Sequence, residues 1–310
     1  MSQPGFQMAT AGPSWPALPL QDWKDTRDTL QLYTQIVGKI RMALSPELNQ
    51  WWHVTLYVTS RGLGTSPIPY GGGTFEIDFD FLKHQLDIHT SDGDRKLLPL
   101  AAQPVATFYE RVMAALRSLG ISVEIDTRPQ ELGDGVKPFE RDYDHASYDR
   151  EYVDRFWRIL ISSGRVLEEF RARFVGKCSP VHFFWGSFDL ACTRFSGRPA
   201  PPRKGVITGP AYSQEVISAG FWPGGGAVND AAFYAYAAPS PAGLDVERIQ
   251  PEEASWNRDL GEFILMYDDL RRSRAPEAKL MSFLESTYAS AARLAGWDRS
   301  LVRATGASHA

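Results

Sequence analysis

The spacing of hydrophobic residues changes several times along this chain of 310 residues, and each spacing predicts a different kind of element. In four stretches the apolar residues recur every three or four positions, as on one face of an amphipathic helix. Ser45-Pro46 and Gly120 supply stop signals after the first two stretches, and Asp149 is a suitable N-cap for the third. The apolar positions that predict these helices span residues 30–44, 105–119, 153–174 and 280–294.

Elsewhere in the first half apolar and polar residues alternate, as they do in antiparallel strands with one solvated face. This pattern covers residues 52–59 and 75–89, and Asp92-Gly93 marks a tight turn between short strands. The strand-like stretches of the second half are apolar or aromatic on both faces. Such a sheet is covered on both sides or encloses a cavity. These stretches lie near residues 182–194, 211–219, 232–238 and 261–267.

Each half therefore contains a helix, several strands and a helix in the same order. We predict the α+β class, with two pseudo-repeated units that pack together, each a helix, a four-stranded antiparallel sheet and a helix. An internal duplication is favoured because Val37-Gly38-Lys39, Trp52 and Arg61 recur in order as Val175-Gly176-Lys177, Trp185 and Arg194. The predicted boundaries are a flexible segment at 1–20, units at 21–126 and 147–298, a linker at 127–146 and a flexible tail at 299–310.

Composition narrows the class of protein. The chain is 43% hydrophobic and 23% charged, as expected for a globular protein, and its net charge of -4 without a basic block predicts no nucleic acid partner. It has no run of the roughly 20 apolar residues that a membrane helix needs, so we expect no membrane partner. Cys178 and Cys192 lack the spacing of a zinc site or a disulfide framework, and a cytoplasmic location is predicted. Cofactor and oligomeric state stay unknown at this stage.

A metal site is not expected either, because no H-x-H or H-E-x-x-H spacing occurs. Any metal would need ligands from distant segments, such as His53, His182 and Glu215. His84 and His89 have charged neighbours and are interpreted as solvated side chains. The glycine runs at 71–73 and 224–226 match neither a P-loop nor a dinucleotide motif, and are interpreted as turns or the lips of a pocket.

The best candidate for chemistry is the run from Ser179 to Leu190, in which His182 and Asp189 stand alone among Phe and Trp residues. A buried imidazole or carboxylate persists only if it is paired, hydrogen-bonded or used on a ligand. One interpretation is a structural network in which Arg194 pairs with Asp189 or Glu215. The other is a binding site that uses the same groups.

In the second interpretation the protein is an enzyme acting on a small organic molecule by acid/base chemistry. The catalytic groups are then His182 with Glu215 or Asp189, and Arg194 orients the substrate. An alternative is a non-catalytic protein that binds or senses a small molecule in the same pocket, and a third is a protein interaction platform. The remaining substrate-binding residues would be Trp185, Trp222, Tyr234, Tyr236 and His53.

Several long segments carry a resemblance to a known family. They read VHFFWGSFDL at 181–190, RFSGR at 194–198, YSQEV at 212–216 and GFWPGGG at 220–226. These segments resemble the signatures of a bacterial family catalogued as a domain of unknown function, and the likeness runs from about Trp15 to Trp297. The resemblance implies no catalytic residues, so the site must be argued from the side chains themselves.

Overall fold

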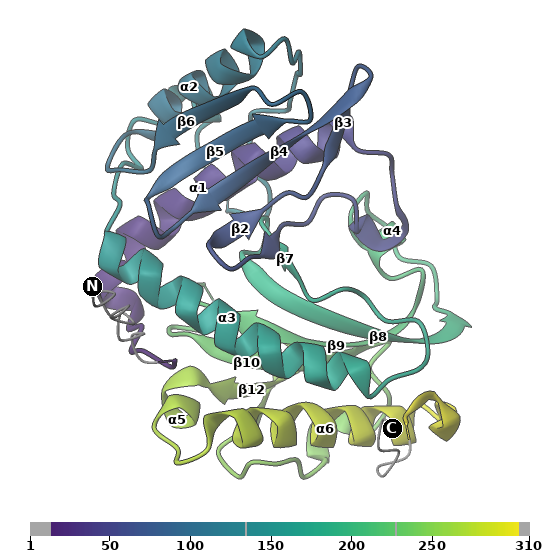
Figure 1. Ribbon diagram of the computed structural model, residues 1–310. Coiled ribbons are helices and arrows are strands. Elements are labelled where there is room, and N and C mark those ends of the chain that lie inside the picture. The colour runs from purple at the N-terminus through teal and green to yellow at the C-terminus, as the bar shows by residue number, and fades with distance from the viewer. Residues whose placement is uncertain (1–13, 134, 227, 304–310) are drawn as a thin grey trace, which may run out of the picture.

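The computed structural model describes residues 14–133, 135–226 and 228–303. Two antiparallel sheets and their flanking helices make up the fold, so the predicted α+β class is confirmed (Figure 1). The α-helices are α1 (Leu20–Leu44), α2 (Val105–Ser118), α3 (Arg150–Ala172), α4 (Thr208–Ala211), α5 (Tyr267–Arg271) and α6 (Pro276–Leu294). The 3-10 helices are η1 (Asn49–Trp51), η2 (Phe139–Arg141), η3 (Leu244–Val246) and η4 (Arg299–Leu301).

The four predicted long helices are α1, α2, α3 and α6, and their ends follow the local signals. Helix α1 stops at Ser45 before Pro46, and α2 stops just before Gly120, whose φ is 74°. The Asp149 side chain accepts hydrogen bonds from the backbone N–H groups of Glu151 and Tyr152 and so caps α3. These boundaries are local properties, which is why the sequence predicts them.

The N-terminal sheet contains β1 to β6 and runs in the order β1-β2-β4-β5-β6, with β3 also paired to β4. Its central strand alternates as predicted, with Phe75, Ile77 and Phe79 buried and Glu76 and Asp78 partly exposed. Figure 1 shows α1 behind this sheet and α2 at its upper edge. The strands are β1 (Tyr57–Val58), β2 (Gly62–Gly64), β3 (Ile68–Tyr70), β4 (Gly73–Asp80), β5 (Gln85–Thr90) and β6 (Arg95–Pro99).

The C-terminal sheet also has six strands rather than the predicted four, in the order β11-β12-β10-β9-β8-β7. Helices α3 and α6 pack together against one face of β8, β9 and β10 (Figure 1). The strands are β7 (His182–Phe184), β8 (Asp189–Pro199), β9 (Gln214–Trp222), β10 (Ala232–Ala238), β11 (Ser255–Asn257) and β12 (Glu262–Met266).

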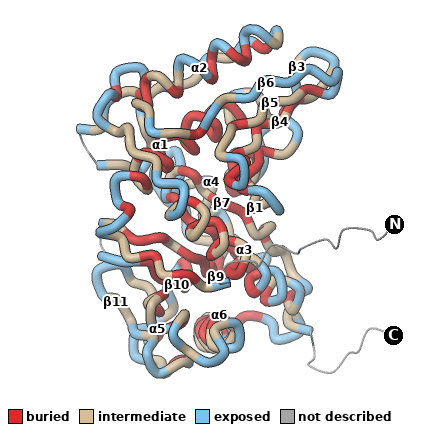
Figure 2. The backbone as a smooth tube through the Cα atoms, turned by 60° about the vertical axis from the view of Figure 1, so that its left-hand side comes forward, coloured by how far each residue is buried: buried red, intermediate tan, exposed pale blue. Residues whose placement is uncertain are grey.

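Helix α1 lies at the centre of the molecule. Every residue from Thr29 to Arg41 is buried, and Figure 2 shows buried backbone running through both sheets and α1. The hydrophobic core is continuous, because one cluster of buried residues includes Ile36 on α1, Ile77 in the N-terminal sheet and Phe221 in the C-terminal sheet. The two sheets also meet at their edges, where the N–H groups of Leu56 and Phe183 each donate to the other's carbonyl at 2.9 and 2.7 Å.

Two predicted strands are shorter than expected. The stretch 182–194 is a hairpin, because the chain turns between β7 and β8 with Phe188 at a φ of 61°. The stretch 52–59 forms a strand only at Tyr57–Val58, because Gln50 and Trp51 adopt left-handed φ angles of 53° and 62° and start a turn. The pseudo-repeat stays a prediction, although both units do consist of helices and an antiparallel sheet.

The described parts of the predicted flexible ends pack on the body of the protein. The Trp15 ring lies 6.4 Å from Phe233 and 6.3 Å from Tyr267, and the Tyr267 hydroxyl donates to the Pro16 carbonyl at 2.7 Å. Near the other end, Val302 forms a backbone bridge with Phe174. Residues 1–13 and 304–310 lie outside the described residues.

Candidate functional site

A pocket of about 420 Å³ lies on the face of the C-terminal sheet opposite α3 and α6. Strands β7 to β10 form its floor. Its walls come from the end of α1, the turn around Trp51 and Trp52, the linker at Gln130 and Glu131, and the loop before β9. Residues far apart in the sequence therefore converge here, and the volume is in the range of small-molecule sites.

Side chains along β8 alternate between the two faces of the sheet, and this alternation determines which of them reach the pocket. Asp189, Thr193 and Phe195 line it, together with Ala191. The residues between them point to the opposite face, toward α3 and α6, because successive side chains of a strand alternate. The structure thus places the predicted residues His182, Trp185, Asp189, Tyr234 and Tyr236 around one pocket.

Asp189 is the buried acidic group of this pocket. The hydroxyl groups of Ser187 and Tyr234 donate to its two carboxyl oxygens. Tyr234 belongs to β10 and reaches across β9 at Gly220, where a Cβ atom would lie 2.5 Å from the tyrosine oxygen. Burial raises the pKa of Asp189, and these two hydrogen bonds oppose the rise without cancelling it.

A second carboxyl group, that of Glu131, stands at the rim and comes from the linker. Three polar residues of α1, spaced four apart on one face, hold this region in place. The Gln31 amide donates to the Gly186 carbonyl at 2.7 Å, and the Gln35 side chain accepts from the Gln130 N–H at 2.7 Å and donates to its carbonyl at 2.9 Å. The third, Lys39, donates to the linker carbonyls of Asp126 and Arg128 at 2.9 and 2.5 Å.

Glu131 as a whole is exposed, yet its carboxyl group turns inward: a Cβ atom on Gly186 would lie 2.8 Å from its Oε2. Desolvation of this carboxyl and the nearby charge of Asp189 raise the pKa of Glu131. Glu262 at the start of β12 is similar, since burial and then Asp189 raise its pKa to about 7. Asp189 therefore contributes to the raised pKa values of both Glu131 and Glu262 at this end of the sheet.

His182 lines the same pocket from β7 and is buried, with 1% of its surface exposed. Among the described residues its Nδ1 has no hydrogen-bond partner, and its ring lies 4.7 Å from that of Phe184. Burial, and then the positive charges of Arg41 and Arg171, lower the pKa of His182 to about 3. The imidazole is therefore neutral at neutral pH and is available to hydrogen-bond a ligand rather than to attract an anion.

Aromatic side chains form most of the remaining lining. The Trp185 indole packs against Gly38 of α1, where a Cβ atom would lie only 2.2 Å from the ring, and its N–H donates to the Val54 carbonyl at 2.7 Å. The rings of Tyr234 and Tyr236 stack 6.1 Å apart, and the Tyr236 hydroxyl lies 3.0 Å from that of Tyr212. These contacts fix the orientation of the rings.

Arg194, a predicted substrate-binding residue, lies outside the pocket. It is fully buried on the opposite face of β8, where its guanidinium stacks 3.4 Å from the Phe170 ring and 4.3 Å from the Tyr288 ring and donates to the Phe170 carbonyl. The Glu285 carboxylate lies 3.9 Å away. Arg194 lies outside the pocket because successive side chains of a strand point to opposite faces of the sheet. It is an odd number of residues from Asp189, so the two side chains point to opposite faces.

Glu215 is placed on that opposite face as well, as β9 alternates in the same way. The Arg198 guanidinium donates to its carboxylate at 2.6 and 2.9 Å, and the Ser196 hydroxyl donates at 3.0 Å. Glu215 is thus the partner of a surface arginine, and it does not face His182. The predicted acid/base pair of His182 and Glu215 is not brought together.

The other two predicted residues also lie outside the lining of the pocket. His53 is buried beside the Trp51 ring, and its Nδ1 accepts from the Leu48 N–H at 3.1 Å, so it braces the turn that follows α1. Trp222 lies at the end of β9 in a separate apolar cluster with Val228 and Ile264. Glu131 and Tyr212 line the pocket without having been predicted from the sequence. The same is true of Ser187, although its position two residues before Asp189 was an available signal.

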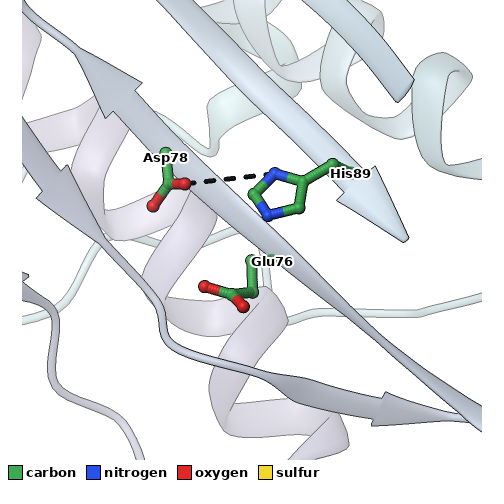
Figure 3. A group of neighbouring side chains, drawn as sticks. All are labelled: Glu76, Asp78 and His89. Carbon is green, nitrogen blue, oxygen red and sulfur yellow. Dashed lines mark ion pairs between the residues drawn. The ribbon is translucent and has the colours of Figure 1, made fainter. Parts of the chain in front are cut away.

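The distant set of metal ligands considered from the sequence, His53, His182 and Glu215, is not assembled. Among the described residues one other group has suitable atoms within reach, namely Glu76, Asp78 and His89 on the partly exposed face of β4 and β5 (Figure 3). Burial raises the pKa of Asp78 to about 6, and the His89 Nδ1 lies 4.0 Å from its carboxylate.

Comparison with known proteins decides the family. A family model described as a family of unknown function (DUF5996) matches residues 15–304. The chain belongs to this family. No curated protein and no solved structure matches the chain, so family membership comes without an assigned activity. No helix in the described ranges combines the length and apolar character needed to cross a membrane.

Proposed function

We propose that this DUF5996 protein is an enzyme that acts on a small organic molecule by acid/base chemistry in the pocket of the C-terminal sheet. Asp189 is the group that gives or takes the proton, and Glu131 is the second carboxyl group at the rim. Neutral His182 donates or accepts a hydrogen bond to the substrate, and the rings of Trp185, Tyr234 and Tyr236 hold its apolar part. Arg194 and Glu215 have no role in this proposal, since they lie on the other face of the sheet.

The observation that carries the proposal is the environment of Asp189. Its carboxyl group is buried at a pocket of suitable size, hydrogen-bonded to Ser187 and Tyr234, and its pKa is raised. A carboxyl group whose pKa moves toward neutrality exchanges protons most effectively at the working pH of the cell. Burying a carboxyl group costs free energy of folding, which hydrogen bonds offset only in part. A buried carboxyl group with a raised pKa that faces a pocket is therefore a candidate for proton transfer.

A second candidate is a non-catalytic protein that binds or senses a small molecule in the same pocket. The low pKa of His182, about 3, favours this alternative, because an imidazole of such low basicity is a poor general base. The aromatic lining serves binding equally well in both cases.

Turnover of metabolites tests the enzyme proposal. Purified protein is incubated with a small-molecule extract, and compounds that disappear or form are followed by mass spectrometry against D189N and E131Q variants. The proposal expects at least one substrate–product pair that depends on Asp189. A compound that is retained by the protein but never converted supports the binding alternative, and identical profiles for wild type and D189N refute the acid/base role.

The wider setting is proposed as well: a bacterial, cytoplasmic protein with a small-molecule partner and neither a nucleic acid nor a membrane partner. Support comes from the net charge of -4 and from Cys178 and Cys192, whose sulfur atoms lie 3.8 Å apart as free thiols. An internal duplication is supported by the two helix–sheet–helix units. The first strands of the two sheets, β1 and β7, lie next to each other.

A further inference from the structure

The balance of charge in the pocket constrains which molecules it accepts. Asp189 and Glu131 contribute carboxyl groups, but no lysine or arginine lines the pocket in the part of the chain that the structure describes. His182 is neutral at neutral pH. An ionised carboxylate at Asp189 would thus lack a positively charged partner within the protein.

The basic residues near the pocket are already engaged elsewhere. The Lys177 ammonium donates to the side-chain oxygens of Gln50 and Gln214 at 2.8 and 3.1 Å and lies 4.5 Å from the Phe195 ring. Arg41 donates to the Thr55 carbonyl and stacks 5.2 Å from the Tyr57 ring. The Arg203 guanidinium lies 4.2 Å from the Tyr212 ring. None of these three side chains is a lining residue, so no basic group of the described residues lines the pocket beside Asp189.

The aromatic side chains point to the same class of ligand. Trp185, Tyr234 and Tyr236 present ring surfaces in the same pocket as Asp189. The Tyr212 ring is set apart, because the Arg203 guanidinium lies 4.2 Å from it. The electron-rich faces of tryptophan and tyrosine attract cations, and the effect strengthens where water is excluded. The Tyr234 hydroxyl donates a hydrogen bond to Asp189, so the tyrosine ring is held beside the carboxyl group.

We propose that the pocket selects an organic amine: the ammonium group binds at Asp189 and Glu131, and an apolar body of the ligand lies on the aromatic rings. This inference rests on the proposed function and specifies its substrate class. The ammonium group supplies the positive charge that the protein lacks at this point, whereas a ligand carboxylate would face two acids with no basic group to offset them.

Calorimetric titration at pH 7.5 with matched probes tests the proposal. The first set is 2-phenylethylamine, 2-phenylethanol and 3-phenylpropanoate, which share a phenyl ring and a two-carbon chain and differ in the terminal group. The second set is butylamine, butanol and pentanoate, which shows whether the ring matters. We expect the amine of the first set to bind at least about tenfold more tightly than the alcohol, and the carboxylates not to bind.

Variants then locate the ammonium group. D189N and E131Q should each reduce the affinity for 2-phenylethylamine by about tenfold and leave the affinity for 2-phenylethanol within about twofold. E252Q removes one negative charge from an exposed position and serves as the matched control, with no change expected. E131Q acts at an exposed residue and so remains informative if D189N fails to fold.

Three results would overturn the amine assignment: an alcohol or carboxylate that binds as tightly as its amine, an amine preference that survives both D189N and E131Q, or no binding by either amine. The proposed function is judged separately, because the extract experiment makes no assumption about ligand charge. Binding of the alcohols alone would reject the amine and keep a small-molecule pocket.

Discussion

The Tyr234 hydroxyl donates a hydrogen bond to the Asp189 carboxyl group from two strands away, passing over β9 where Gly220 has no side chain. The contact fixes an aromatic ring against the buried acid of the pocket. The contact also depends on Gly220, which has no side chain to block the approach of the tyrosine. A Cβ atom at Gly220 would lie 2.2 Å from the Leu190 carbonyl oxygen as well as 2.5 Å from the tyrosine oxygen.

Two substitutions separate these roles. Y234F removes only the hydrogen bond and should lower the free energy of unfolding by about 1.5 to 3 kcal/mol, because a buried carboxyl group loses a donor. G220A should cost more, since the added methyl group overlaps the backbone of β8 and the strands must move apart. Urea unfolding followed by tryptophan fluorescence measures both. A G220A protein as stable as wild type would show that Tyr234 does not need this gap.

The polar residues on α1 predict a long-range effect on the pocket. Q35A removes the two hydrogen bonds that hold Gln130 and should let Glu131 leave the rim. Ligand affinity should then fall about as far as it does in E131Q, while the overall stability changes by about 1 to 2 kcal/mol. A double-mutant cycle checks the mechanism: Q35A should have no further effect on affinity in the E131Q background. Additive losses would mean that Gln35 acts by another route.

Arg194 is predicted to matter for stability and not for the pocket. R194A should lower the free energy of unfolding by about 3 to 5 kcal/mol, because it leaves a cavity between Phe170 and Tyr288. R194L keeps much of the apolar volume and should be the milder variant. The affinity of folded R194L for any pocket ligand should equal that of wild type. A selective loss of affinity at normal stability would restore Arg194 as a binding residue.

Glu262 predicts a pH dependence of stability. Its pKa is raised from 4.5 to about 7 in the folded protein, so between these values the folded state holds a proton that the unfolded state has lost. Stability from this group is present below about pH 4.5 and is lost as the pH rises toward 7. E262Q carries no such charge, so its free energy of unfolding should rise relative to that of wild type as the pH increases across this window. The expected difference is about 1 to 2 kcal/mol after allowance for solvent screening. Thermal melts from pH 4.5 to 8 measure the difference, and parallel curves would contradict the assignment.

The ends of α1 and α2 and the start of α3 were predictable because they depend on neighbours in the sequence. Asp149 caps α3 and Pro46 follows the end of α1 regardless of what lies far away. Strand parity is likewise a property of the sequence, because residues an odd number of positions apart cannot share a face of one regular strand. Asp189 and Arg194 are such a pair, so parity alone excludes Arg194 from the face that carries Asp189.

The position of Glu131 could not be read from its own surroundings. Its place at the pocket depends on hydrogen bonds that Gln35 and Lys39 make to the linker. The bonded residues are 87 to 95 positions apart in the sequence. On a helix these side chains look like an ordinary solvated face, yet α1 is buried on all sides from Thr29 to Arg41. Only the tertiary fold turns that polar face into a support for the pocket.

Occupancy of the pocket is the central claim, and native mass spectrometry tests it most directly. Wild-type protein is exposed to a small-molecule extract, and its native mass is compared with its denatured mass. The matched variant is A191F, whose larger side chain would fill the pocket at a floor position on β8. We predict an added mass on wild type that is absent from folded A191F. The same added mass on both proteins, or none on either, would contradict the claim that this pocket binds a small molecule.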